Sequence, residues 1–135
     1  MTTIDRSLRR FFAYALVGGA GTAAHYGLFL GLLSLRAPVL FASCAGYVVG
    51  ALVNYWLNHA VTFASERPHR EAAPRFFAVA ALGLLLNLSI VAIAVGWANW
   101  PPLLAQIAAT ALCLLATYAL NARWSFATAI GQPKT

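Results

Sequence analysis

Apolar residues fill this chain in four long stretches that short polar segments separate. The stretches run roughly over Phe11–Leu35, Ala37–Glu66, Phe76–Trp100 and Pro101–Ala122. Each supplies the roughly 20 residues that a helix needs to cross about 30 Å of hydrocarbon, and a helix satisfies its own backbone hydrogen bonds there. The pattern therefore predicts an all-α protein with four transmembrane helices, whose cores are expected at about Phe12–Leu33, Val39–Asn58, Phe77–Trp97 and Leu103–Asn121.

The composition supports a bilayer as the solvent. Hydrophobic residues make up 61% of the chain and charged residues only 9%, whereas about a quarter of a soluble domain is charged. Arginines precede the first apolar stretch as they do in a signal peptide, but this stretch is longer than the usual apolar region of about 7–15 residues. We therefore predict that it is a retained helix.

Basic residues predict the orientation in the membrane. One side of the predicted topology carries eight of the nine basic residues, namely Arg6, Arg9, Arg10, Arg67, Arg70, Arg75, Arg123 and Lys134, and the other side carries Arg36. The positive-inside rule then predicts that both termini are cytoplasmic, with short tails at 1–9 and 128–135. The same rule accounts for the net charge of +6 without nucleic acid as a partner, and the charge is expected to attract anionic lipid.

Two sequence echoes predict an internal duplication. Asn54–Asn58 returns as Thr117–Asn121 at an offset of 63 residues, and Arg10–Ala13 returns as Arg75–Ala78 at an offset of 65. We predict one domain over residues 10–127, with a first repeat at about 10–64 and a second at about 75–127. Because each repeat has two helices, both would have the same orientation, as parallel repeats do.

Small and polar residues follow one face of the second and fourth predicted helices. Gly46, Gly50, Asn54 and Asn58 are spaced by four residues, and Ala109, Cys113, Thr117 and Asn121 hold the equivalent places at an offset of 63. The glycines are typical of close helix packing. Asn58 and Asn121 can either hydrogen-bond across helices or donate to a phosphate or sugar hydroxyl, and both interpretations remain open.

The first and third predicted helices carry polar residues near mid-membrane. Thr22 and His25 lie in the first, and Asn87 lies in the third, where it aligns with Thr22 at an offset of 65. A mid-membrane Asn is costly unless it faces other helices or water. We expect His25 to be neutral and hydrogen-bonded to a neighbouring helix.

Several chemistries lack the residues that they need. The acids Asp5, Glu66 and Glu71 all lie outside the predicted spans, and ion-coupled transport of cations usually needs an intramembrane carboxylate. The sequence has no nucleophile–base set, phosphate loop or metal-ligand spacing. We therefore predict a protein that is not an enzyme and has no cofactor or metal, with Cys44 and Cys113 as small buried side chains.

The order of these motifs resembles the GtrA family over about residues 10–127. Phe12–Thr22, followed by Tyr26–Phe29, resembles its opening helix, and Asn54–Asn58 and Asn121–Phe126 resemble its repeated helix end. The resemblance implies a small four-helix protein of the bacterial cytoplasmic membrane that is linked to cell-surface polysaccharide synthesis. Such proteins are thought to move polyprenyl-phosphate-linked sugars, such as undecaprenyl-phosphate glucose, and related domains are attached to glycosyltransferases of the dolichyl-phosphate-mannose-synthase type.

Four positions depart from the family pattern. Gly21 stands where the family often has Asn, His25 where it often has Asp, His59 where it often has Arg, and Val61 where it often has Trp. The second repeat keeps Arg123 and Trp124, which makes it the better candidate for contact with an anion.

The leading hypothesis is a flippase for polyprenyl-phosphate-linked sugar. A polar groove would be lined by Thr22, His25, Asn54, Asn87 and Thr117, and the phosphate would be bound at the inner mouth by Arg10, Arg75, Arg123, Asn58 and Asn121. A bundle of four helices is too small to enclose a transport path, so we expect a homo-oligomer. The first alternative is a non-catalytic anchor or accessory subunit for a glycosyltransferase. A small multidrug exporter is a third hypothesis, against which the missing membrane carboxylate argues.

Overall fold

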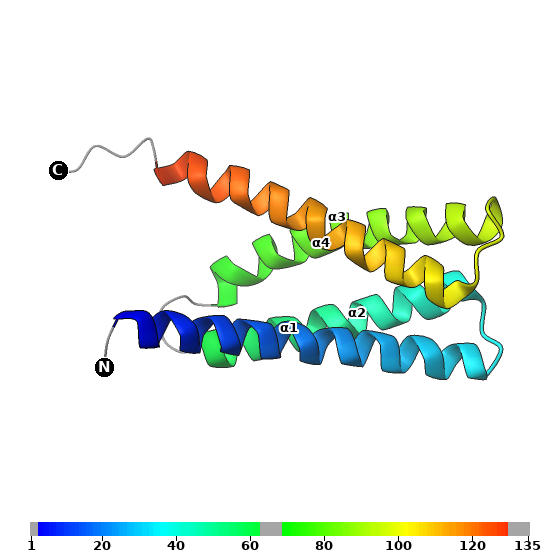
Figure 1. Ribbon diagram of the computed structural model, residues 1–135, viewed down its shortest axis with the longest axis horizontal. Coiled ribbons are helices and arrows are strands. Elements are labelled where there is room, and N and C mark those ends of the chain that lie inside the picture. Colours follow the sequence, from blue (N-terminus) through cyan, green and yellow to red (C-terminus); the bar gives the residue numbers. More distant parts are fainter. Residues whose placement is uncertain (1–2, 63–68, 130–135) are drawn as a thin grey trace. The chain divides into compact units, whose positions relative to one another are not determined.

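The computed structural model describes residues 3–62 and 69–129, and over these residues it is helical with no strand (Figure 1). The helices are α1 (Thr3–Ser34), α2 (Val39–Leu57), α3 (His69–Gly96) and α4 (Pro102–Ala129), and a π-helical turn, η1 (Asn58–Thr62), directly follows α2. Side chains are described over residues 15–60 and 73–116 and for a few residues nearer the N-terminus. The predicted all-α class is confirmed.

Three of these helices contain apolar segments that are long enough to cross a membrane. The segments are Ala15–Ser34, Val39–Ala60 and Ala73–Gly96, of 20, 22 and 24 residues. A shorter apolar segment, Pro102–Ala116, opens α4, which continues for 28 residues in all. The result agrees with the four-helix membrane protein that the sequence predicts.

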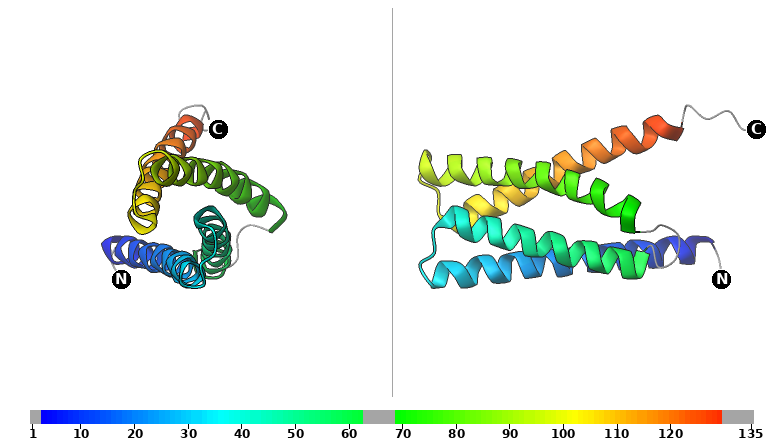
Figure 2. Two further views of the ribbon diagram at one scale, coloured as in Figure 1. Left: turned by 90° about the vertical axis from the view of Figure 1, so that its right-hand side faces the viewer. Right: turned by 180° about the vertical axis from the view of Figure 1, so that it is seen from behind.

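The chain forms two compact units, Met1–Leu84 and Leu85–Thr135. The first unit contains α1, α2, η1 and the beginning of α3, and the second contains the remainder of α3 and α4. In the first unit, α1 and α2 run side by side in opposite directions (Figures 1 and 2). Large apolar side chains on both helices, such as Leu16, Leu30 and Trp56, are exposed and suited to lipid contact.

The turn between α1 and α2 is closed by its own backbone. Arg36 has a φ of 61°, in the left-handed region that ends many helices. The amide of Arg36 donates a hydrogen bond to the carbonyl of Leu33 at 2.9 Å, and the amide of Ala37 donates one to the carbonyl of Leu32 at 3.0 Å. This pair of bonds is the Schellman arrangement, which satisfies carbonyls that the helix end would otherwise leave unpaired.

The turn between α3 and α4 also contains a left-handed residue, but its hydrogen bonds differ. Asn99, which lies 63 residues after Arg36, has a φ of 54°, and the next amide, that of Trp100, donates to the carbonyl of Ala94 at 2.9 Å. The second turn spans residues 97–101 and is one residue longer than the first, at 35–38. Both turns therefore contain a left-handed residue, which lies two residues after the end of α1 and three residues after the end of α3.

Helix ends and buried faces relate α1 to α3 at an offset of 62 residues. The two helices end at Ser34 and Gly96, which lie 62 residues apart. At the same offset, three buried residues of α1 correspond to buried residues of α3, in the pairs Gly21 and Gly83, His25 and Asn87, and Phe29 and Val91.

This register corrects the predicted pairing of Thr22 with Asn87. Thr22 is exposed, whereas Asn87 is only 1% exposed, so the two do not hold equivalent positions. The offset of 65 describes the sequence echo at Arg10–Ala13, and the extra three residues correspond to about 4.5 Å of helix length. Hence Asn87 has His25 as its structural counterpart.

Candidate functional site

Glycines let α1 and α2 approach closely at their crossing. A Cβ added at Gly50 would lie 2.8 Å from the carbonyl oxygen of Gly21, and one added at Gly46 would lie 2.7 Å from that of His25. Neither distance is compatible with a side chain unless the backbone moves. The spacing of Gly46 and Gly50 thus produces the small-residue packing that the sequence predicts.

His25 is buried at this crossing, with 7% of its surface exposed. Its ring lies 5.2 Å from that of Tyr26 and 5.9 Å from that of Tyr47, measured between centroids, with Tyr47 edge-on. Its Nε2 is buried and has no hydrogen-bond partner. The hydrogen bond that we expected from His25 to a neighbouring helix is therefore not made by Nε2, because the facing residue, Gly46, has no side chain.

Asn54 brings a second polar group to the same crossing. Its amide occupies the space that a Cβ at Gly21 would need. Although the residue as a whole is half-buried, its Oδ1 is fully buried and has no hydrogen-bond partner. The predicted groove residues His25 and Asn54 are thus brought together, on either side of Gly21 and Gly50.

The second unit contains a buried polar pair between α3 and α4. Gln106 Nε2 donates to Asn87 Oδ1 at 2.8 Å, and the two side chains are 0% and 1% exposed. Gln106 also lies 3.5 Å from the hydroxyl of Thr110, which donates to the carbonyl of Gln106. Our sequence reasoning missed Gln106, although a glutamine within an apolar helix, 63 residues after the buried Ser43, was a usable signal.

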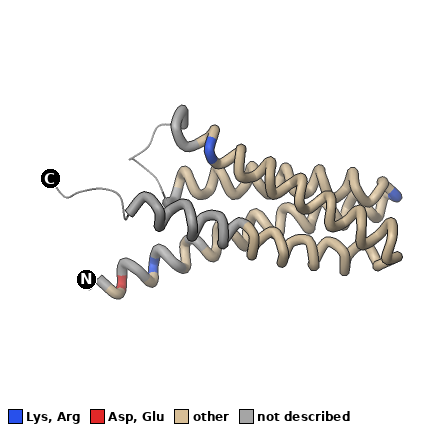
Figure 3. The backbone as a smooth tube through the Cα atoms, turned by 90° about the horizontal axis from the view of Figure 1, so that it is seen from above, with Lys and Arg blue, Asp and Glu red and all other residues tan. Residues whose placement is uncertain are grey.

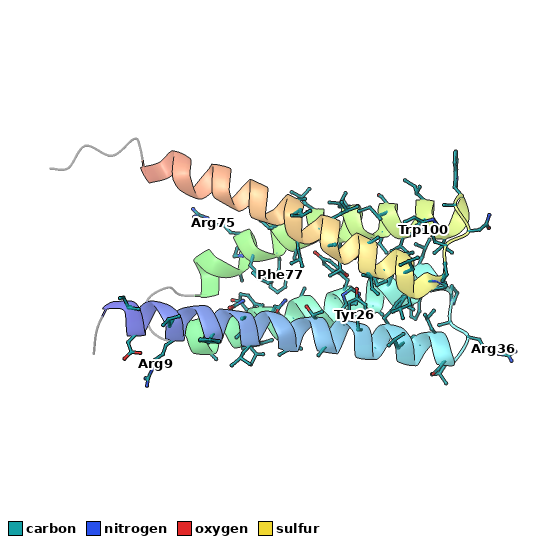
Figure 4. The ribbon with its side chains drawn as sticks, in the orientation of Figure 1. Arg9, Tyr26, Arg36, Arg75, Phe77 and Trp100 are labelled. Carbon is teal, nitrogen blue, oxygen red and sulfur yellow. The ribbon has the colours of Figure 1, made fainter. Side chains whose placement is uncertain are left out.

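An aromatic cluster joins the end of α2 to the beginning of α3. The buried ring of Tyr55 lies 5.3 Å from that of Phe76, 5.1 Å from that of Phe77 and 6.0 Å from that of His59. Arg75 adjoins Phe76 in sequence, and Asn58 lies three residues after Tyr55. Two predicted phosphate-binding residues, Asn58 at the end of α2 and Arg75 near the beginning of α3, therefore lie in the elements that this cluster joins, and Figure 4 labels Arg75 there.

The backbone changes its winding at Asn58. Its amide donates to the carbonyls of both Asn54 and Tyr55, and the π-helical turn η1 begins there. π-Helical turns are rare and are often found at functional sites. Asn58 is half-buried, and the exposed Arg75 lies in the second turn of α3.

Charge is confined to positions near helix ends over the described part of the chain. The charged residues with described side chains are Asp5, Arg9, Arg36 and Arg75, and Figure 3 shows the blue and red positions near helix ends. Among the described residues, no group of three or more His, Cys, Asp or Glu side chains could bind a metal ion. The arrangement offers uncharged hydrogen-bonding groups at the α1–α2 crossing and a cationic side chain at one end.

The comparison with protein families agrees with this geometry. The family described as "GtrA/DPMS, transmembrane domain" matches residues 13–126. The chain belongs to this family. Neither the curated proteins nor the solved structures gave a match to it. Membership in the GtrA/DPMS family associates this membrane protein with glycosyl-lipid metabolism.

Two other predicted groove residues of this GtrA/DPMS domain, Thr22 and Asn87, do not line the crossing. Thr22 is exposed, unlike its neighbour Gly21. Asn87 is buried and hydrogen-bonded in the second unit. The side chains of the other predicted residues, Arg10, Thr117, Asn121 and Arg123, lie outside the described residues.

Proposed function

We propose that this protein moves polyprenyl-phosphate-linked sugar, such as undecaprenyl-phosphate glucose, across the bacterial cytoplasmic membrane. The proposal rests on the aromatic cluster around Tyr55, which packs the end of α2, where Asn58 follows, against the beginning of α3, which carries Arg75. An Arg guanidinium binds phosphate through two parallel hydrogen bonds. The Asn58 amide adds an uncharged donor at the same end of the first unit.

The physical problem for such a lipid lies in its head group. The polyprenyl tail can stay in the bilayer, but the phosphate and sugar must pass through hydrocarbon that offers them no hydrogen bonds. The crossing of α1 and α2 supplies polar atoms on His25 and Asn54 without adding a charge to the membrane. Such atoms lower the barrier for a sugar while the lipid-facing side chains keep the tail in place.

Transport in this proposal is passive. The described spans contain no carboxylate that could couple transfer to a proton or sodium ion, so consumption of the sugar lipid on the far side would drive the net flow. A homo-oligomer would enclose the path more completely than one chain of four helices.

A reconstituted system tests the proposal directly. Vesicles with and without the protein receive undecaprenyl-phosphate glucose labelled in the sugar, and transfer is followed by the fraction of sugar that membrane-impermeant periodate oxidises. We expect protein-dependent transfer, reduced about tenfold or more in Arg75→Gln and Asn58→Ala, because hydrogen bonds to charged groups contribute roughly 1.5–3 kcal/mol. Arg36→Gln, which removes one charge from the other end of α1, is the matched control and should retain transfer.

The accessory-subunit hypothesis predicts a different result. If the protein anchors a glycosyltransferase, vesicles with and without it will show equal transfer, and the protein will instead co-purify with that enzyme. Equal transfer overturns the flippase proposal, whereas protein-dependent transfer that survives both variants overturns only the phosphate site.

A further inference from the structure

We propose that the crossing of α1 and α2 is the sugar-recognition element of this protein, and that His25 Nε2 and Asn54 Oδ1 hydrogen-bond the hydroxyl groups of the sugar as it passes. The inference rests on the proposed function and names the part of the substrate that these residues contact. In this proposal the phosphate is bound by Arg75 and Asn58.

The first argument is an asymmetry between the two repeats. In the second unit, the amide of Asn87 is paired with Gln106 at 2.8 Å. His25 holds the position of Asn87 in α1, and Ser43 holds the position of Gln106 in α2. His25 Nε2 nevertheless has no partner. One repeat has a closed polar pair, and the other keeps a polar atom that can accept a ligand.

The second argument is energetic. A buried polar atom that makes no hydrogen bond costs about 1–3 kcal/mol. The crossing contains two such atoms, on His25 and Asn54, although it is otherwise packed closely through Gly21, Gly46 and Gly50. A ligand that satisfies both atoms recovers this cost. The closed crossing is thus destabilised relative to one in which α1 and α2 separate around a polar group.

The third argument concerns the chemistry of the ligand. Asn54 Oδ1 is an acceptor only, and an ionised phosphate oxygen is also an acceptor only, so the two repel each other. A sugar hydroxyl can donate to Asn54 Oδ1 and can donate to or accept from a neutral imidazole nitrogen. The rings of Tyr26 and Tyr47 beside His25 add apolar faces for the C–H groups of a sugar ring. Figure 4 labels Tyr26 in the C-terminal half of α1.

The fourth argument is spacing. Asn54 precedes Asn58 by four residues, which is about 6 Å along a helix. This separation is comparable to the distance from a phosphate to the remote hydroxyl groups of the sugar attached to it. A phosphate held near Asn58 would therefore place the sugar beside Asn54, and movement deeper would bring the sugar to His25.

Binding in lipid nanodiscs tests the inference. Native mass spectrometry would measure the affinity for undecaprenyl-phosphate glucose, for undecaprenyl phosphate without sugar, and for a phosphate-free alkyl glucoside. Thermal unfolding of each variant would be measured in parallel. The variants are His25→Phe and Asn54→Leu, which keep volume and remove the polar atoms, with Ser89→Ala as an exposed control.

We expect His25→Phe and Asn54→Leu to weaken binding of both sugar-bearing lipids about tenfold, the effect of roughly one lost hydrogen bond, and to leave undecaprenyl phosphate unchanged. Because the variants remove unpaired buried atoms, their melting temperatures should be equal to or above that of the unaltered protein. Asn87→Leu provides the stability contrast and should melt earlier, since it removes the buried hydrogen bond between Asn87 and Gln106.

The outcomes separate the two proposals. If the unaltered protein binds none of the three lipids above a neutral phospholipid, both the function and the inference fail. If it binds them but His25→Phe and Asn54→Leu bind all three normally, only the inference fails. Lowered melting temperatures with equal loss for all three lipids would indicate a structural role and would also overturn the inference.

Discussion

Gln106 donates a 2.8 Å hydrogen bond to Asn87 between two helices whose side chains are almost fully buried at this point. Replacing either residue with leucine removes this buried hydrogen bond, so we expect Asn87→Leu and Gln106→Leu each to destabilise the protein by about 1–3 kcal/mol. The double variant should lose less than the sum of the two. Unfolding in mixed detergent micelles would measure this double-mutant cycle, and additive losses would contradict an energetic link between the two residues.

Gly21 should not tolerate a side chain. Gly21→Ala places a methyl group in the space that the Asn54 amide occupies, and overpacking of this kind costs typically about 1–3 kcal/mol. Gly27→Ala is the matched control in the same helix, because a Cβ there meets nothing within 4 Å. Thermal unfolding should show a lower melting temperature for the first variant only. Equal melting temperatures would show that Asn54 moves aside freely.

Substitution by glycine is predicted to affect stability differently at the two left-handed turn residues. Arg36 has a φ of 61° and Asn99 a φ of 54°. Arginine is strained in this region by about 1–2 kcal/mol, whereas asparagine tolerates it better. We expect Arg36→Gly to raise stability and Asn99→Gly to change it little. Chemical unfolding of both variants checks the order, and a larger gain for Asn99→Gly would contradict it.

The aromatic cluster predicts that Tyr55 is needed for both stability and transfer. Tyr55→Ala removes a ring that packs against Phe76 and Phe77, and loss of a buried aromatic side chain costs about 3–5 kcal/mol. Tyr55→Phe keeps the ring and should cost far less. Trp56→Ala, at the exposed neighbour, is the control. Unfolding experiments and the vesicle assay would measure these variants. A small loss of stability and transfer in Tyr55→Ala would argue against the cluster as the element that positions Arg75.

The predicted orientation can be tested with single cysteines in a background that lacks Cys44 and Cys113. The exposed positions Leu35 and Ala98 lie in the two turns, and Asp5 lies near the N-terminus. We expect a membrane-impermeant thiol reagent applied to intact cells to label Leu35→Cys and Ala98→Cys but not Asp5→Cys. The reverse pattern would invert the topology.

The number and type of helices follow directly from the apolar stretches, because lipid admits few alternatives to a helix of this length. The buried register was harder to predict. The echo between Arg10–Ala13 and Arg75–Ala78 suggested an offset of 65, whereas the buried faces of α1 and α3 match at 62. A sequence echo records which residue types recur, but burial depends on where each helix ends and on the length of its turn.

The candidate site was predicted in part for a similar reason. His25 and Asn54 were recognised because polar residues within apolar helices are costly, and the structure brings them to one crossing. Thr22 was included on the same grounds but lies on an exposed position of α1. Gln106 was overlooked although it is fully buried. Residue type alone does not say which face of a helix is covered.

The short closed turns have a consequence for how the protein enters the membrane. Residues 35–38 and 97–101 carry a single charge, on Arg36, and each turn satisfies backbone groups through its own hydrogen bonds. Such a turn needs little hydration when it is carried through the bilayer, since the strongest barrier to translocating a short loop is its basic residues. In the predicted orientation, in which both turns cross the bilayer, each pair of helices would be inserted as one hairpin, with the second turn crossing more readily than the first.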